Sequence, residues 1–346
     1  MSLRDSTERK DNDETGPNTK NGTTPTKLCS ACGKASNALK KCNGCKCAWY
    51  CDKDCQNKHR KEHKKECRLI KKVLENRGGK LDLGTEEDLG PLPDLPPREE
   101  CPICMRSMPD HVKEIYCEFC GKSICGGCNF QHHVQSEKRA IEKGQKRVPP
   151  TCAFCREPIP QSDEEKVRQL RKRVEINDPV AMVMLGVDYG YGLLGLPVDE
   201  AKCVDLLRNA ADLGHPDAQG KLGAFHYEGG MGLEQSEEEA RKYWKKAAEG
   251  GHLTSLSMLG GTEEMNCDRV AALRYWRLSV SGGSKLSMEL LIECFARGSL
   301  RHEDLAETLQ AMYLARAEMR SEGRDQYIEH LKRTGEYLAE YEMYYR

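Results

Sequence analysis

The chain has 346 residues, enough for two or three domains, and 32% of them are charged. Its mean hydropathy of -0.73 predicts a surface-rich protein without a membrane span. The formal net charge is -1, so no global electrostatic field favours nucleic acid or an acidic membrane.

Residues 1–27 contain almost no large apolar side chains. They cannot bury enough surface to fold, which predicts a disordered tail. They also lack the apolar stretch of a secretory signal, so we expect a cytoplasmic or nuclear protein whose thiols stay reduced. Disulfide bonds are the weaker alternative for the cysteines.

Cysteines dominate the first half of the chain, where sixteen of the nineteen precede Arg156 in two sets. The first set runs Cys29-x2-Cys32, Cys42-x2-Cys45, Cys51-x3-Cys55 and His63-x3-Cys67. Eight ligands are enough for two tetrahedral zinc sites. A segment of about 39 residues is also small enough to need a metal for folding.

The string from Cys42 to Cys67, with Trp49-Tyr50-Cys51 and Cys55-Gln56, resembles a MYND-type zinc finger, and the resemblance covers residues 28–70. It implies interleaved zinc ligands in two groups: Cys29, Cys32, Cys51 and Cys55, and then Cys42, Cys45, His63 and Cys67. It also implies a groove for proline-containing peptides near Gln56.

Cys47 and His59 stand outside this ligand pattern, and we expect a loop thiol and an exposed histidine. His59 takes the place of an aromatic residue common in the family, which argues against peptide binding. The lysines and arginines of residues 53–72 are interpreted as solvated side chains on a short helix. A nucleic-acid-binding face is the less favoured alternative. Residues 71–97, whose second part is acidic and proline-rich, are read as a linker.

The second set runs Cys101-x2-Cys104, twelve residues, Cys117-x2-Cys120, four residues, Cys125-x2-Cys128, twenty-three residues and Cys152-x2-Cys155. Four knuckles again predict two zinc ions. Replacement of one cysteine by His132 or His133 is the alternative.

This order resembles a RING finger over residues 98–160. The resemblance implies one zinc held by Cys101, Cys104, Cys125 and Cys128 and another held by Cys117, Cys120, Cys152 and Cys155. RING fingers dock ubiquitin-conjugating enzymes, and the implied contacts are Ile103, Arg156 and Pro158. The chain departs from the family at Ala153, where Pro is usual, and in the longer gap between Cys120 and Cys125. The alternative is a zinc fold without ligase activity.

Helical repeats are predicted for residues 162–300. Leu185-Gly186, Leu222-Gly223 and Leu259-Gly260 recur at intervals of 37 residues, which indicates paired helices in an α-solenoid. These phrases resemble Sel1-like repeats, which are related to tetratricopeptide repeats. A fourth, degenerate unit is expected near Leu291. Trp244 and Trp276 occupy equivalent places, so we interpret them as packing residues.

Several local signals surround the repeats. Ser162 and Glu165 have the spacing of a capping box ahead of a helix that leads into the first repeat. Glycines at 214, 251 and 282 are expected to end the second helices in the left-handed conformation. Residues 301–346 are predicted to form further helices, one of them carrying Tyr327, Leu331, Leu338 and Tyr341. Cys203, Cys267 and Cys294 are expected to be buried.

The chain is therefore predicted to be a multidomain protein: two small zinc-binding modules followed by an all-α Sel1-like solenoid. No phosphate loop, nucleophile elbow, zinc-protease motif or methyltransferase domain is found. The module order resembles that of diatom and algal proteins, which implies architecture rather than a reaction. The expected function is a scaffold with four zinc ions that binds proteins or peptides. The alternative is a RING-type ubiquitin ligase that recruits substrate through the repeats.

Overall fold

The computed structural model describes residues 27–36, 38–80, 89–108, 115–144 and 149–334. The predicted tail, apart from Lys27, lies outside these ranges, as do Leu338 and Tyr341. Among the helices within the described ranges, none has the length and apolar character that a membrane span requires.

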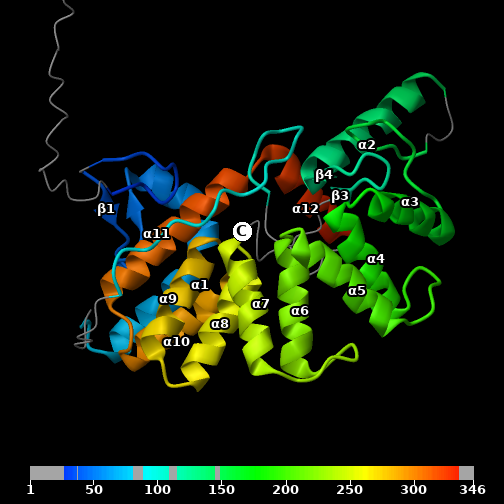
Figure 1. Ribbon diagram of the computed structural model, residues 1–346. Helices are drawn as coiled ribbons and strands as arrows, with labels where there is room; N and C mark the ends of the chain where they lie inside the picture. Colours follow the sequence, from blue (N-terminus) through cyan, green and yellow to red (C-terminus); the bar gives the residue numbers. More distant parts are fainter. Residues whose placement is uncertain (1–26, 37, 81–88, 109–114, 145–148, 335–346) are drawn as a thin grey trace, which may run out of the picture.

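The first zinc module is a short antiparallel hairpin followed by a long helix (Figure 1). Strand β1 (Lys40–Lys41) pairs with β2 (Trp49–Tyr50), and α1 (Lys53–Asn76) follows. Helix α1 begins where the Asp52 carboxylate accepts a hydrogen bond of 2.8 Å from the Cys55 amide, an N-cap. The short helix that was expected is wrong, because α1 has 24 residues and continues beyond residue 70.

The second zinc module repeats this plan with a different helix. Strand β3 (Ile115–Tyr116) pairs with β4 (Ser123–Ile124), and α2 (Gly126–Glu142) follows at once. Cys125 is the N-cap of α2, so a candidate ligand also starts the helix.

Paired helices form the rest of the described chain. Helix α3 (Asp163–Glu175) leads into the repeats and begins at the predicted cap Ser162. The helices that follow are α4 (Pro179–Tyr191), α5 (Glu200–Asp212), α6 (Pro216–Glu228), α7 (Glu237–Glu249), α8 (Leu253–Met265), α9 (Arg269–Ser281), α10 (Lys285–Arg297), α11 (His302–Met319) and α12 (Glu322–Thr334). Helices α4 and α5, α6 and α7, and α8 and α9 pack as antiparallel pairs stacked side by side (Figure 1).

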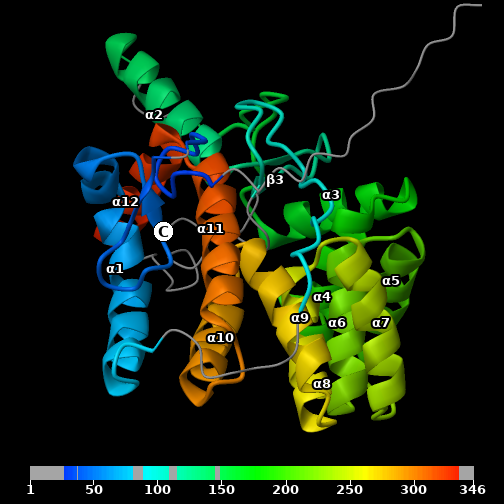
Figure 2. The same ribbon diagram turned by 90° about the vertical axis from the view of Figure 1, so that its left-hand side faces the viewer.

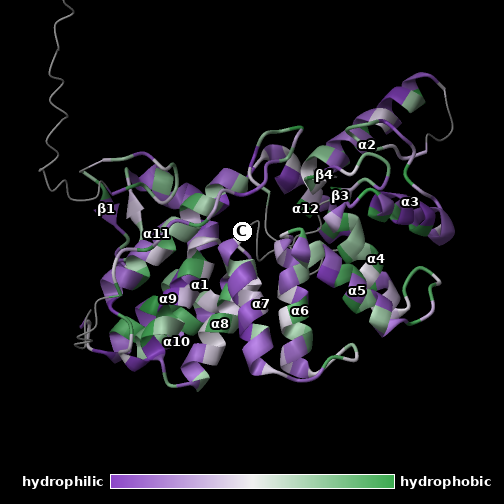
Figure 3. Cartoon of the chain, viewed as in Figure 1, coloured by the Kyte–Doolittle hydropathy of each residue, from purple (hydrophilic) through white to green (hydrophobic). Residues whose placement is uncertain are grey.

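Amphipathic helices give the pairs their core. Helix α7 is hydrophilic over most of its visible surface in Figure 3, whereas its Ala240, Trp244 and Ala247 are buried. A Cβ atom on Gly223 would overlap the Trp244 ring, and one on Gly260 would overlap Trp276. Both indoles are 1% exposed, so their predicted packing role is confirmed.

The turns between pairs use left-handed glycines. Gly214 has φ +84°, Gly251 +83° and Gly283 +105°, values that a side chain would strain. The prediction was wrong by one residue at the third turn, where Gly282 has φ -73° and Gly283 takes the left-handed role.

Both zinc modules are docked on the helical array. Cys42 and Cys45 of the first module share one apolar cluster with Trp276 of α9 and Phe295 of α10. Figure 2 shows α1 beside α10 and α11. Helix α2 of the second module packs on α12, where a Cβ atom on Gly126 would overlap the Tyr327 ring.

Asp178 joins the second module to the first repeat. Its carboxylate accepts hydrogen bonds of 2.7 Å from the Tyr116 hydroxyl and 2.9 Å from Arg173 Nε, and it also caps α4. Burial alone would raise the pKa of Asp178, but the bonds from Arg173 and Tyr116 hold it below its ordinary value. The carboxylate is therefore ionised at neutral pH and ties three segments together.

Replacing this carboxylate should loosen the junction. We expect Asp178→Ala to lower the free energy of unfolding by about 2–4 kcal/mol, because a helix cap and two charge-assisted hydrogen bonds are lost. Asp178→Asn retains an oxygen for the cap and is expected to lose about half as much. Urea denaturation at pH 7 measures both variants. Equal stability of Asp178→Ala and the wild type would contradict this role.

Candidate metal centres

Sixteen side chains form four tetrads within the described residues. In each tetrad, the four ligand atoms lie within 4.8 Å of one another. The first module provides Cys29, Cys32, Cys51, Cys55 and, separately, Cys42, Cys45, His63, Cys67. The second provides Cys101, Cys104, Cys125, Cys128 and, separately, Cys117, Cys120, Cys152, Cys155. The structure thus brings together the groups that the two family resemblances imply.

The spacing of the ligand atoms fits zinc. A tetrahedron with Zn–S bonds of about 2.3 Å places two sulfurs about 3.8 Å apart. One sulfur pair in each tetrad lies 3.7–3.9 Å apart: Cys32 and Cys51, Cys42 and Cys67, Cys104 and Cys125, Cys117 and Cys155. A disulfide needs about 2.05 Å, and all nineteen cysteines are free. Each tetrad can therefore hold one zinc ion.

Backbone geometry explains why two residues separate the cysteines of a knuckle. Directly after the second cysteine, Gly33, Lys46, Met105, Gly121 and Arg156 all have φ between +51° and +71°. Their amides donate to the carbonyl of the first cysteine, for example Met105 to Cys101 at 2.8 Å. This turn folds the chain back, so both thiols point to one metal. Cys125-x2-Cys128 differs because it forms the first turn of α2.

His63 is oriented by a residue far along the chain. Its Nε2 lies 3.3 Å from Cys45 Sγ, facing the tetrad, and its Nδ1 lies 2.9 Å from the Tyr313 hydroxyl on α11. A metal-binding histidine ordinarily makes such a bond through its other ring nitrogen, which fixes the tautomer and the ring plane. Tyr313 therefore links this zinc site to the solenoid.

Loss of that bond should weaken zinc binding. We expect Tyr313→Phe to lower the zinc affinity of the site by about 10–100-fold, the usual effect of removing a partner of a ligand. Competition with a chromophoric chelator measures the change. Tyr50→Phe is the matched control, because the Tyr50 hydroxyl binds the non-ligand His59 at 3.0 Å. If the two variants retained zinc equally well, Tyr313 would have no role in orienting His63.

His59 is buried, contrary to the expectation of an exposed ring. It is 4% exposed, and the Tyr313 ring stands edge-on to it with centroids 4.3 Å apart. Burial, with the neighbouring His63, lowers the pKa of His59 to about 3. The ring is therefore neutral and packs, like that of His63, between α1 and α11. Gln56, on the expected peptide groove, is exposed.

The cysteines outside the tetrads are not equivalent. Cys47 lies in a loop as expected, fully buried, with Sγ 3.2 Å from Nε2 of His302. Cys203 and Cys294 are buried as predicted. The prediction for Cys267 was wrong: it is exposed, in the turn between α8 and α9, with φ +63°.

A histidine and an arginine border the last knuckle of the second module. His132 is not a ligand in the tetrads; its Nε2 lies 2.9 Å from the Thr151 hydroxyl and its Nδ1 2.6 Å from Arg156 Nη1. Burial and then the charge of Arg156 lower the pKa of His132. A neutral His132 thus accepts a hydrogen bond from Arg156 and places the guanidinium beside α2.

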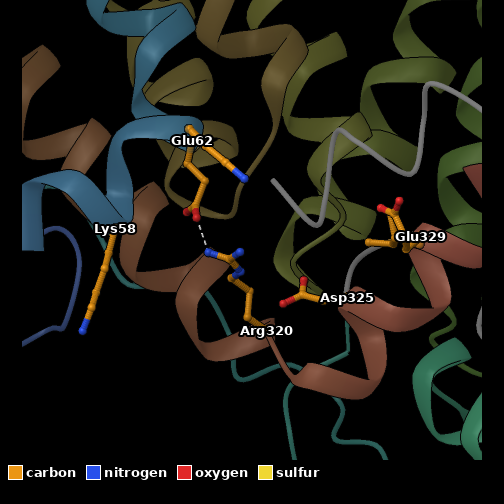
Figure 4. A pocket seen from close by; sticks show the side chains of 7 residues that line it. Lys58, Glu62, Arg320, Asp325 and Glu329 are labelled. Atoms are coloured by element: carbon orange, nitrogen blue, oxygen red, sulfur yellow. Dashed lines mark hydrogen bonds and ion pairs between the residues drawn. The ribbon is translucent and has the colours of Figure 1, made fainter.

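Two arginines from the α11–α12 region lie near the two modules, one buried and one partly exposed. Arg324 is fully buried; it donates to Ser107 O at 2.9 Å and lies 3.9 Å from Cys104 Sγ. At the other module, Arg320 pairs with Glu62 of α1 (Figure 4). That pair lies in a hollow of about 240 Å³ between α1 and α12, whose other labelled residues are Lys58, Asp325 and Glu329. Positive and negative side chains both line this hollow. Such a mixed lining suits contact between the helices better than binding of a strongly charged ligand.

Comparison with known families agrees with two of the modules. Residues 29–67 match the MYND finger family, and residues 179–215 and 216–252 each match the Sel1 repeat family. The chain thus combines zinc-binding fingers with Sel1 repeats. It is 38% identical over 53 residues to the histone-lysine N-methyltransferase ASHR1 of Arabidopsis thaliana. That match covers 15% of this chain and only 11% of that relative.

Two solved structures are similar to parts of this chain. A Sel1 repeat protein from Oxalobacter formigenes is 25% identical, with a TM-score of 0.35, over 37% of this chain and 98% of that one. The antigen c5321 of uropathogenic Escherichia coli is 21% identical, with a TM-score of 0.38, over 60% of this chain and 42% of that one.

Residues outside the cysteine pattern went unrecognised in the sequence. Tyr313 and His302, more than 230 residues from their partners in the first module, carry no motif. Arg324 is likewise an ordinary basic residue of an amphipathic helix. No local signal distinguishes them.

Proposed function

We propose that the protein is a zinc-stabilised scaffold that binds other proteins through surfaces held rigidly by its zinc modules and repeats. The observation that carries the proposal is the exposure of large apolar side chains on two knuckles of the second module. Ile103 is 43% exposed, Met105 67% and Phe154 47%. Exposed apolar groups on a rigid scaffold are typical of interaction sites.

The two knuckles adjoin one another. Ala153, beside Phe154, belongs to the same small apolar cluster as Cys101 and Cys104. The zinc ions and the knuckle turns would hold these loops in place, so a partner meets a preformed surface and little conformational entropy is lost on binding. The surface need not fold around its partner.

A capture experiment tests this surface. Immobilised zinc-loaded protein is compared with the double variant Ile103→Asp, Phe154→Asp for the proteins that it retains from an extract of its source cells. We expect at least one protein to be retained by the wild type and lost with the variant. Met265→Asp is the matched control, because Met265 is 61% exposed on the repeats. Identical retention by all three proteins would count against the proposal.

The second candidate function is a RING-type ubiquitin ligase, favoured by the placement of Ile103 and Arg156. Both residues are exposed, on knuckles that adjoin, and Pro158 is exposed nearby. A RING-like module would dock a ubiquitin-conjugating enzyme on Ile103, while Arg156 would leave His132 to hold the ubiquitin thioester in a reactive pose.

Ubiquitin discharge separates the two functions. A panel of ubiquitin-loaded conjugating enzymes is incubated with the wild type, Ile103→Ala and Arg156→Ala, and loss of the thioester is followed over time. A ligase should accelerate discharge for at least one enzyme, and each substitution should abolish most of the acceleration. Equal discharge with and without the wild-type protein across the panel would exclude the ligase function and leave the scaffold.

A further inference from the structure

An extended segment of the chain lies across the edge of the solenoid. Residues 89–99 form neither helix nor strand, and they run from the end of the first module toward the second over the repeat helices (the cyan coil in Figures 1 and 2). Four prolines lie among them, at positions 91, 93, 96 and 97. Proline restricts the backbone to extended conformations of the polyproline II type.

Burial along this segment has a period of three residues. Leu89 is 7% exposed, and Leu92, Leu95 and Arg98 are half-buried. The prolines and Asp94 between them are exposed. Gly90 has φ +72°, so the polyproline II pattern of three residues per turn applies only after it and places Leu92, Leu95 and Arg98 on one face, whereas Leu89 precedes the glycine. That face contacts the repeats.

Specific contacts anchor both ends of the segment. Near its start, the Gly90 carbonyl accepts a hydrogen bond of 3.2 Å from Arg277 of α9, whose side chain is 2% exposed. Near its end, the Arg98 guanidinium donates to the Gly282 carbonyl and lies 2.8 Å from the sulfur of Met319. Contacts with the repeat helices therefore hold the segment's backbone at Gly90 and its side chain at Arg98.

The receptor is built from equivalent turns of successive repeats. Pro96 lies beside Gly251 in the α7–α8 turn, 3.0 Å from where a Cβ atom would stand. Leu95 lies beside Gly282 in the α9–α10 turn, 2.8 Å from the corresponding position. Because both positions are glycine, no Cβ atom occupies the space into which the Pro96 and Leu95 side chains pack. We call these two turns, with Arg277 and Met319, the turn ledge.

We propose that the turn ledge is a binding site for extended peptides of partner proteins that carry leucine at every third position, intervening prolines and a terminal arginine. The chain's own residues 89–99 are the resident occupant, and a partner segment of the same chemistry displaces them. This inference deepens the proposed scaffold function and rests on it. The spacing of the contacts on the turn ledge determines the class of peptide that would fit it.

Physical chemistry favours this class of ligand. A proline-rich segment is already extended in solution, so it loses little conformational entropy when it docks. A tethered occupant competes at an effective concentration on the order of 1 mM. A separate peptide must therefore bind wild-type protein weakly, and it must bind more tightly once the resident segment is impaired.

The experiment uses a fluorescent peptide of residues 89–99 and the full zinc-loaded chain. We expect the peptide to bind the double variant Leu92→Asp, Leu95→Asp at least tenfold more tightly than the wild type, as measured by anisotropy. Asp94→Asn, an exposed position of the same segment, is the matched control and should behave as the wild type. A peptide with both leucines replaced by aspartate should not bind the double variant.

Two further measurements keep the test decisive. Native mass spectrometry and circular dichroism establish that the double variant retains its zinc and helices. If it does not fold, Arg98→Ala serves in its place, with an expected threefold gain in peptide affinity. Equal affinity for the wild type and the folded variant, or no binding to the variant at 1 mM peptide, would overturn the proposal. Retention of partners through Ile103 and Phe154 is measured in a separate experiment. Failure of one proposal therefore does not imply failure of the other.

Discussion

The variant Cys45→Ser is expected to bind three zinc ions in place of four and to release the first module from the repeats. Cys45 is fully buried, with Sγ 3.3 Å from Nε2 of His63. Structural zinc in such a small domain supplies about 10 kcal/mol of folding free energy. Because Cys45 shares an apolar cluster with Trp276 and Phe295, loss of this metal also exposes part of the repeat core.

Native mass spectrometry counts the ions, and thermal unfolding followed at 222 nm reports the loss of helix α1. Cys47→Ser is the control, since Cys47 is equally buried two residues away but lies outside the tetrads. Its serine hydroxyl can keep the contact with His302, so four ions and a nearly unchanged melting temperature are expected. Four ions in Cys45→Ser, or three in Cys47→Ser, would contradict the ligand assignment.

The variant Trp276→Ala is expected to lower the free energy of unfolding by about 3–5 kcal/mol, the range for removing a buried aromatic side chain. Its indole is 1% exposed, rests on Gly260 and donates to the Ser257 carbonyl at 3.3 Å. It also belongs to the cluster that receives the first zinc module. We therefore expect the substitution to speed zinc loss from that module.

Trp244→Ala provides the comparison. Trp244 makes the equivalent contacts one repeat earlier, with Gly223 and the Gly220 carbonyl, but it lies in a separate apolar cluster. Both variants should lose similar stability in urea, whereas only Trp276→Ala should release zinc faster to a chelator. Equal rates of zinc loss from the two variants would contradict coupling between the first module and α9.

Short-range patterns made much of this fold predictable. The recurring Leu-Gly pairs located the helix pairs correctly. A glycine that packs against a tryptophan at a fixed repeat spacing allows few other arrangements of the helices. Ser162 marked the start of α3, since a cap requires only the next three residues. Errors appeared where neighbours in space decide burial, as at His59 and Cys267. His59 is covered by the Tyr313 ring, and Cys267 lies in an exposed turn.

The sequence by itself determined which residues can hold zinc, because coordination depends on residue type and on spacings of two or three residues within a knuckle. Only the tertiary structure decided that the first module also docks on the helical array and that residues 89–99 lie on the turn ledge. Some of these contacts join residues 250 positions apart, such as His63 and Tyr313. They depend on the three-dimensional match of surfaces, which leaves no period and no motif along the chain.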